Sequence, residues 1–175
     1  GEPNHKIQGH LERRAYQLAE PYLKACGLSS EALADIKVLL LGTDVSSPSE
    51  HEESYVALLK DVFVAHSKGR APRAHLPDEL QPLAARKDLT LMALLLHEAD
   101  IATSDGLDYA LTKEETILLA REQGHAEVRP SQILSFLDRL CEGSWRSAAS
   151  RTLFEANRTR IRKAVQDDVK AGNHP

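Results

Sequence analysis

Apolar residues recur at spacings of three and four along nearly the whole chain, and this period is the strongest constraint on the fold. The first such stretch runs from Leu11 to Cys26, and Gly27 follows as a C-terminal stop. The sequence contains no convincing run of alternating β-branched residues and no internal repeat. These patterns predict an all-α protein.

Six further helices are predicted, which gives a bundle of about seven helices in a single domain spanning residues 1–175. The stretch Glu31–Gly42 is apolar enough to be central, and Asp88–Ile101 is predicted to be buried. Residues 67–86 form the one long predicted loop, which contains three prolines and several basic side chains. The other predicted helices are Ser47–Phe63, Thr112–Gly124, Pro130–Leu140 and Ser147–Ala171.

Composition excludes several classes of protein. The 175 residues carry a formal net charge of -4, which disfavours general binding to nucleic-acid backbones. No apolar run reaches the roughly 18 residues of a membrane span, and the N-terminal residues lack a signal-peptide pattern. Two cysteines, Cys26 and Cys141, are too few for a disulfide framework and fit a reducing, cytoplasmic compartment.

Polar residues stand at the ends of the two most apolar predicted helices. His97, Glu98 and Asp100 close one of them, and Thr43 and Asp44 close the other. Carboxylates rarely enter a core unless they are paired or bind a metal, so this pattern indicates a polar cavity between the two helix ends. The alternative is that Asp44 and Asp100 are exposed caps or ion-pair partners at helix ends.

The same segments carry a resemblance to a known family. IKVLLLGTDVSS (residues 36–47) and LTLMALLLHEADIATS (residues 89–104) resemble two consecutive signatures of class I cyclic-nucleotide phosphodiesterases. Leu11-Glu12 is similar to the family's "LE.HH" helix, and residues 1–4 to the end of its "HDxxHPGxxN" motif. SQILSFLDRLCEGSW (residues 131–145) is similar to "SQxxFIDxxxxPLW". The family belongs to the HD superfamily of metal-dependent phosphohydrolases, and the resemblance spans nearly the whole chain.

The resemblance implies a two-metal phosphodiesterase of the HD fold, in which a metal-bridging hydroxide attacks phosphorus. Zinc, magnesium or manganese would be the cofactor, and a 3',5'-cyclic nucleotide the leading small-molecule substrate. Asp100 matches a metal ligand, and Glu12 matches a carboxylate that orients metal-bound water. His97 matches the histidine beside that ligand, with support of the helix end as its implied role.

The substrate site is implied by the same comparison. Gln132 resembles the glutamine that hydrogen-bonds the purine, and Phe136 resembles the aromatic residue that stacks on it. Gln132 falls one position early relative to Phe136, a rotation of about 100° on a helix. The remaining polar residues that match the lining of the site are Asn4, Thr43 and Asp44.

The chain departs from the family in its metal-binding residues. It contains no His-Asp dipeptide, Arg13 and Arg14 replace the family's "HH", and the family's first metal ligands precede the point where this chain begins. A divalent metal needs about four to six ligands, so we expect an incomplete site and an inactive chain, the C-terminal part of a larger domain. The remaining histidines are predicted to lie on the surface or in loops: His5, His10, His51, His66, His75, His125 and His174.

Two rival functions stay open. One is a different HD enzyme that hydrolyses another nucleotide or a phosphomonoester, which the shifted Gln132 favours. The other is a degenerate HD module that binds a ligand or partner without turnover, which the missing His-Asp pair favours. The basic loop is predicted to be solvated, and the charged C-terminal helix to be a packed outer helix with a solvated face. Trp145 and Phe154 are predicted to be core anchors.

Overall fold

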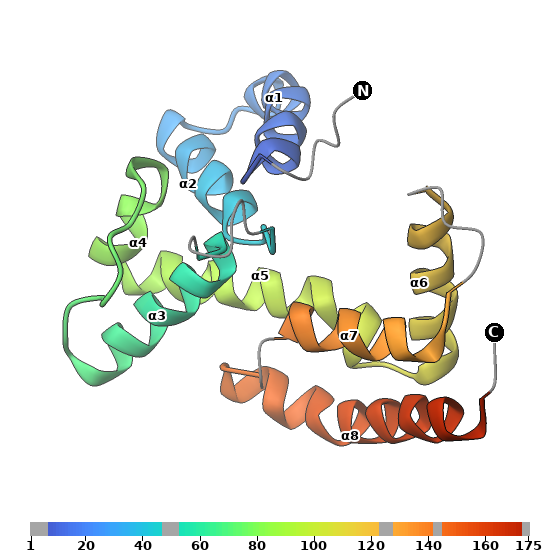
Figure 1. Cartoon of the computed structure of the whole chain (residues 1–175). Coiled ribbons are helices and arrows are strands. Elements are labelled where there is room, and N and C mark those ends of the chain that lie inside the picture. The colour runs from blue at the N-terminus through green and yellow to red at the C-terminus, as the bar shows by residue number, and fades with distance from the viewer. Residues whose placement is uncertain (1–6, 47–52, 123–127, 142–144, 173–175) are drawn as a thin grey trace. The chain divides into compact units, whose positions relative to one another are not determined.

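The computed structural model describes residues 7–46, 53–122, 128–141 and 145–172. Within these ranges all regular structure is helical, with eight α-helices, one 3₁₀ turn and no strand (Figure 1). The predicted all-α class is therefore confirmed. The elements are α1 (His10–Ala25), α2 (Ser30–Leu41), α3 (Tyr55–Lys68), η2 (Asp78–Leu80), α4 (Gln81–Ala85), α5 (Lys87–Asp105), α6 (Tyr109–Glu122), α7 (Pro130–Cys141) and α8 (Ala148–Ala171).

The chain divides into two compact units, Gly1–His97 and Glu98–Pro175. The boundary falls inside α5, so the first unit contains the N-terminal part of that helix and the second contains its last turns. Each unit has apolar clusters of its own.

The core of the first unit is formed by apolar residues of α2, α3, α4 and the start of α5. Leu59, Leu83 and Leu94 are fully buried at its centre. Burial of each such side chain contributes roughly 1.5–3 kcal/mol, which makes this cluster the main source of stability for the unit. The cluster comprises Val38, Leu41, Tyr55, Leu58, Leu59, Val62, Leu76, Leu80, Leu83, Leu89, Ala93 and Leu94.

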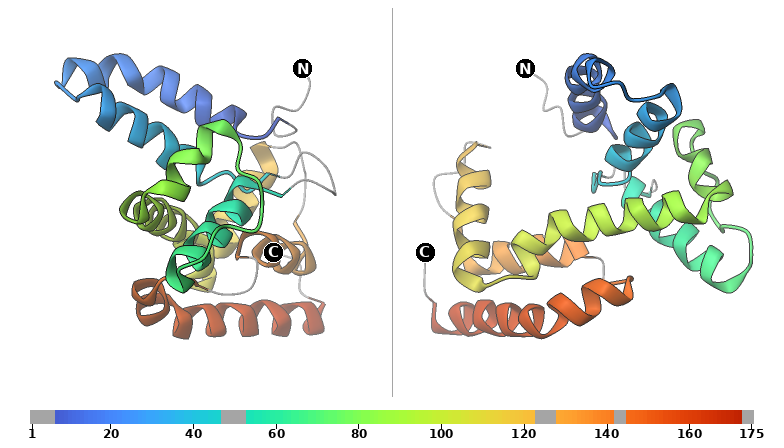
Figure 2. Two further views of the ribbon diagram at one scale, coloured as in Figure 1. Left: turned by 90° about the vertical axis from the view of Figure 1, so that its left-hand side faces the viewer. Right: turned by 180° about the vertical axis from the view of Figure 1, so that it is seen from behind.

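Helix α1 packs along α2, and the two lie side by side in both views of Figure 2. Its N-cap is Gly9, whose φ of 68° lies in the left-handed region. A Cβ at this position would lie 3.0 Å from both Leu41 and Tyr55. Only glycine therefore allows the chain to enter α1 this close to the core.

In the second unit, α7 and α6 pack against α8. Ile133, Leu137, Ile161 and Val165 are buried between these helices. A smaller cluster joins the last turns of α5 to α8. There Trp145 is 3% exposed, and its ring centroid lies 5.4 Å from that of Phe154, which is partly buried. The prediction that both aromatic residues are core anchors is confirmed.

Several predicted boundaries differ from those of the structure. The predicted helix start at residues 47–50 lies outside the described residues, and α3 begins at Tyr55 with Ser54 as its N-cap. The predicted loop 67–86 contains η2 and the short helix α4. The capping box predicted at Thr112 is wrong, because Asp108 caps α6 by accepting a hydrogen bond from the Leu111 N–H. The Thr112 hydroxyl instead donates to backbone carbonyls of residues 104 and 108.

The prediction that the helix over Asp88–Ile101 is buried all round is wrong for one face. Four large apolar side chains of α5 are 37–43% exposed: Leu91, Met92, Leu95 and Leu96. The opposite face, with Leu94 and His97, is fully buried. No described helix combines the length and the apolar character that crossing a membrane requires.

We expect Gly9→Ala to destabilise the protein by about 2–3 kcal/mol, because the new Cβ adds crowding to the strain of a left-handed conformation. The matched control is Gly69→Ala. Gly69 has a similar φ of 62°, but a Cβ added there would meet open space, with no neighbouring side chain within 4 Å. The control should cost about 1 kcal/mol by backbone strain alone. Urea denaturation followed by circular dichroism measures both, and equal losses would contradict the crowding.

Candidate functional site

Asp44 connects the end of α2 to the start of α1. Its side chain is buried, and one carboxylate oxygen accepts a hydrogen bond from the Gly9 N–H at 2.6 Å. The other oxygen accepts bonds from the backbone N–H and the hydroxyl of Ser46, at 2.8 and 2.6 Å. The alternative of an exposed cap is therefore wrong for Asp44, which is a buried carboxylate satisfied by its own unit.

The end of α2 also packs against α5. A Cβ at Gly42 would lie 3.4 Å from Ala93 Cβ and from Leu59, so the helix end approaches α5 closely. His97 lies one helical turn beyond Ala93 on the same side of α5. Thr43, beside Gly42, donates its hydroxyl hydrogen to the Leu40 carbonyl. Within the first unit, the end of α2 thus lies beside both the N-cap of α1 and the part of α5 that precedes His97.

His97 is a buried histidine with unusual surroundings. Its side chain is fully buried, and neither ring nitrogen has a hydrogen-bond partner among the described residues. Burial, with a smaller contribution from the positive charge of Lys60, lowers the pKa of His97 to about 3. The imidazole is therefore neutral at physiological pH, with an unshared electron pair on one ring nitrogen.

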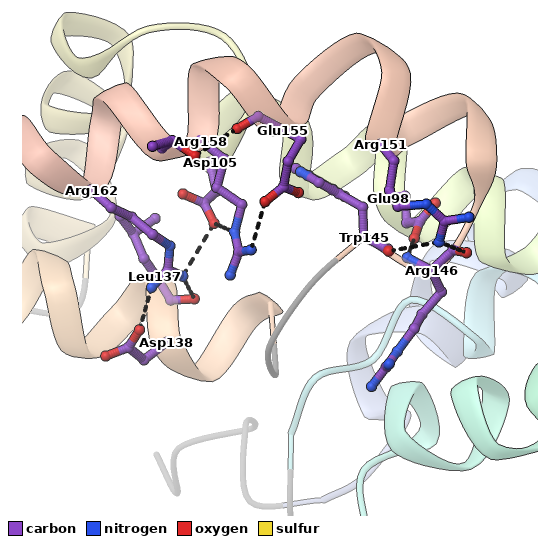
Figure 3. Close-up of polar contacts among 11 residues, drawn as sticks. Glu98, Asp105, Leu137, Asp138, Trp145, Arg146, Arg151, Glu155, Arg158 and Arg162 are labelled. Carbon is purple, nitrogen blue, oxygen red and sulfur yellow. Dashed lines mark hydrogen bonds and ion pairs between the residues drawn. The ribbon is translucent and has the colours of Figure 1, made fainter.

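Glu98 begins the second unit and stabilises the start of α8. Its buried carboxylate accepts a hydrogen bond from the backbone N–H of Arg146 (Figure 3). It also accepts one from the backbone N–H of Ser147, at 3.1 Å. Ser147 is the N-cap of α8, and its hydroxyl oxygen accepts from the Ser150 N–H. A carboxylate in this position satisfies N–H groups that the helix leaves unpaired and interacts favourably with the helix dipole.

Asp100, the predicted metal ligand, lies on the exposed side of α5 within the second unit. Partial loss of solvation, and then the neighbouring carboxylate of Glu115 on α6, raise the pKa of Asp100. Glu115 in turn accepts a hydrogen bond from the Ser104 hydroxyl at 3.2 Å. A pair of neighbouring carboxylates is an arrangement that divalent cations favour, and the sequence pattern did not single out Glu115.

The other predicted site residues are distributed over both units. Glu12 lies in the first turn of α1 and is partly exposed. Gln132 is engaged locally, since its side-chain oxygen accepts a hydrogen bond from the Arg129 N–H before α7. Phe136 packs against the apolar cluster between α7 and α8. Asn4 lies outside the described residues.

The predicted site residues do not form a complete metal site. The part of the chain that the structure describes contains no group of three or more His, Cys, Asp or Glu side chains able to hold a metal ion. Asp100 with Glu115 supplies two carboxylates, whereas a divalent ion takes about four to six ligands. The described residues alone therefore do not fit a resident catalytic metal.

One polar cluster was missed by sequence reasoning. Asp105, at the end of α5, has no exposed surface and accepts charge-assisted hydrogen bonds from Arg158 at 3.0 Å and Arg162 at 3.2 Å (Figure 3). Arg162 also contacts the Leu137 carbonyl and Asp138 on α7. Part of the positive charge of α8 is therefore engaged in ion pairs with α5 and α7 of the same unit. The sequence indicates this cluster only through the spacing of Arg158 and Arg162, which are four residues apart and therefore share one helix face.

A scan against protein-family models, a search of curated proteins and a search of solved structures found no match to this chain.

We expect the stability of the first unit to fall as the pH drops below about 6.5. The unfolded His97 takes up a proton near the ordinary pKa of 6.5, whereas the folded residue does so only near 3. The unfolded state therefore binds more protons in this interval, and the loss should reach about 2 kcal/mol at pH 5. Urea denaturation between pH 5 and 7 measures this loss in the free energy of unfolding.

His97→Met removes the titration and should flatten this pH dependence, whereas a change of the exposed His75 to Gln should leave it intact. An unchanged slope in His97→Met would contradict the assignment of the pH dependence to His97.

Glu98→Ala should destabilise the second unit by about 2–3 kcal/mol, because it leaves two backbone N–H groups without their charged acceptor. Urea denaturation followed by fluorescence reports on this unit specifically, since Trp145 is the one tryptophan of the chain. Glu114→Ala, at an exposed position of α6, is the control and should change stability by less than about 0.5 kcal/mol. Similar losses in both variants would argue against a structural role of Glu98.

Proposed function

We propose that this chain is part of a metal-dependent phosphohydrolase of the HD superfamily, with a 3',5'-cyclic nucleotide as the leading substrate. The proposal is supported above all by the convergence of the resembling segments in the first unit. The Gly9–Asp44 hydrogen bond joins the start of the "LE" helix to the "GTD" segment, and the end of α2 approaches α5 one turn before His97. These two contacts, which join segments that are separate in the sequence, are the support for the proposal within the first unit.

In this proposal each residue has a limited role. Asp100 is a metal ligand, Glu12 orients water, and the neutral His97 supports the end of the motif on α5. A bound Zn²⁺, Mg²⁺ or Mn²⁺ would supply Lewis-acid activation of water and of the phosphoryl oxygens. The described residues provide too few ligands for that ion. As the comparison of the sequence with the family implies, the chain by itself is proposed to have little or no activity.

Two observations favour the rival functions. Asp44 and Glu98, two buried carboxylates within the motifs, already accept hydrogen bonds from backbone N–H groups, which favours a ligand-binding module without turnover. Gln132 is engaged with the Arg129 N–H, which favours a substrate that is not recognised through a purine. Another phosphohydrolase of the HD superfamily, acting on a different nucleotide or a phosphomonoester, is the second candidate.

The proposal is tested by titrating the chain with Mn²⁺ and following paramagnetic broadening of the backbone NMR signals. We expect broadening centred on Asp100 and Glu115 at sub-millimolar Mn²⁺, because the two neighbouring carboxylates attract a divalent cation. Asp100→Asn should abolish it, and Glu31→Gln, at an exposed carboxylate of α2, should not. Broadening absent from this region, or unchanged in Asp100→Asn, would overturn Asp100 as a metal ligand.

Substrate class is tested separately with the same protein. Cyclic nucleotides that bind only when Mn²⁺ is present would support the phosphodiesterase assignment. Tight binding of a nucleotide without metal and without hydrolysis would instead support the binding module.

A further inference from the structure

Helix α1 is attached to the first unit without any buried residue of its own. Leu11, Leu18 and Tyr22 are 56–75% exposed and lie on one side of the helix. By contrast, α3 of the same unit contains seven buried residues. Because most of the stability of a helix in a protein comes from packing of its apolar face, α1 is held less firmly than α3.

The sequence of α1 also gives this helix little stability of its own. Its N-cap, Gly9, provides no side-chain hydrogen bond, and Pro21 lies inside the helix, where it lacks the N–H of the regular pattern. The helix has 16 residues, close to the length of about 12–15 below which isolated helices are marginal in water. Once undocked, α1 is therefore expected to unfold.

The polar contacts that hold α1 to other elements are concentrated at its start. The Gly9 N–H donates a hydrogen bond to Asp44 at 2.6 Å. One turn later, Arg13 donates to both carboxylate oxygens of Glu79 in η2, with the shortest contact at 2.6 Å, and to the Tyr55 hydroxyl oxygen. We call these contacts of Gly9 and Arg13 the α1 latch.

The other end of α1 is joined to α2 by a short turn. The side chains of Tyr16 and Lys24 pair with Glu20 of the same helix. The turn contains Gly27, which has a φ of 83° and open space where a Cβ would lie. From this turn on, α1 and α2 lie side by side (Figure 2). The two helices therefore form a hairpin that can open about the turn when the α1 latch breaks.

Opening of this hairpin would uncover the end of α2. Asp44 is buried, and one of its carboxylate oxygens has the Gly9 N–H as its partner. The central apolar cluster of the unit is formed by described residues of α2, α3, α4 and α5 and the segments beside them, and α1 contributes none of them. The departure of α1 therefore exposes Asp44 without dismantling the core.

We propose that α1 is a strap that opens and closes over Asp44 while the central core of the first unit stays folded. The α1 latch holds the closed form, and the turn at Gly27 is the hinge. Asp44 is one of the residues that the family resemblance places at the site, so opening would also control access to that site. This last consequence rests on the proposed function, whereas the opening itself follows from contacts within the fold.

Native-state hydrogen exchange of the whole chain, followed by NMR without added metal, tests the opening. The amides of α1 and of Gly9 should exchange through one common opening. Its population should be at least about 100-fold larger than that of the opening that exposes the amides of Leu59 and Leu94 in the core. Equal protection of α1 and of the core would overturn the proposal, because α1 would then open only when the whole unit unfolds.

Two matched variants test the α1 latch. Arg13→Ala should speed the exchange of the α1 amides about tenfold, and Glu79→Gln should act in the same direction. Arg70→Ala is the control, since Arg70 forms a partly exposed ion pair with Asp61 that stays intact when α1 opens. It should speed exchange of the core amides and leave α1 unchanged. Equal acceleration of α1 by Arg13→Ala and Arg70→Ala would contradict the proposal.

Carboxyl labelling with a carbodiimide and an amine tests the exposure of Asp44. Asp44 should be labelled faster in Arg13→Ala than in the wild type, because α1 opens more often. Glu98, a buried carboxylate of the second unit, is the internal control and should react at the same rate in both proteins. Unchanged labelling of Asp44 alongside faster exchange of α1 would contradict the role of α1 as a cover for this carboxylate.

Discussion

The hydrogen bond from the Gly9 N–H to Asp44 determines how the first unit is assembled. A buried carboxylate must have partners, and Asp44 finds one of them at the N-cap of α1, 35 residues earlier in the chain. Because Gly9 has no Cβ, its left-handed backbone makes that approach without a clash against Leu41 and Tyr55. The second unit uses the same device, since Glu98 accepts bonds from the backbone at the start of α8. Two carboxylates that look like site residues in the sequence thus act first as connectors between helices.

Most of the helices could be predicted because periodicity reports directly on local structure. The start of α7 at Pro130 and the N-cap of α8 at Ser147 follow from rules that involve only neighbouring residues. Exposure could not be predicted in the same way. Leu91 and Leu18 are apolar like core residues, but both are exposed. The apolar pattern of one helix does not reveal which of its faces another element covers. Asp108 was overlooked as a cap because Thr112, four residues later, fits the capping-box pattern equally well.

The candidate site was predictable only as a set of segments. The sequence indicates that Asp44, His97 and Asp100 stand at the ends of apolar helices, but the partners of these groups are distant in the chain. The hydrogen bonds of Glu98 reach residues nearly fifty positions away, and those of Asp105 reach residues more than fifty positions away. Whether a carboxylate binds a metal, caps a helix or pairs with arginine depends on such contacts, which spacing along one helix does not encode.

The two sides of α1 respond to dissolved ions in opposite ways. The pairs that Arg13 of α1 and Lys37 of α2 form with Glu79 of η2 are partly exposed, so mobile ions screen them and loosen the attachment of both helices to η2. The exposed apolar side chains of α1, which include Leu11, Leu18 and Tyr22, carry no charge, and salts excluded from protein surfaces, such as sulfate, favour their burial. Salt concentration and salt type therefore act on this helix separately, the first on its ion pairs and the second on the exposure of its apolar side chains.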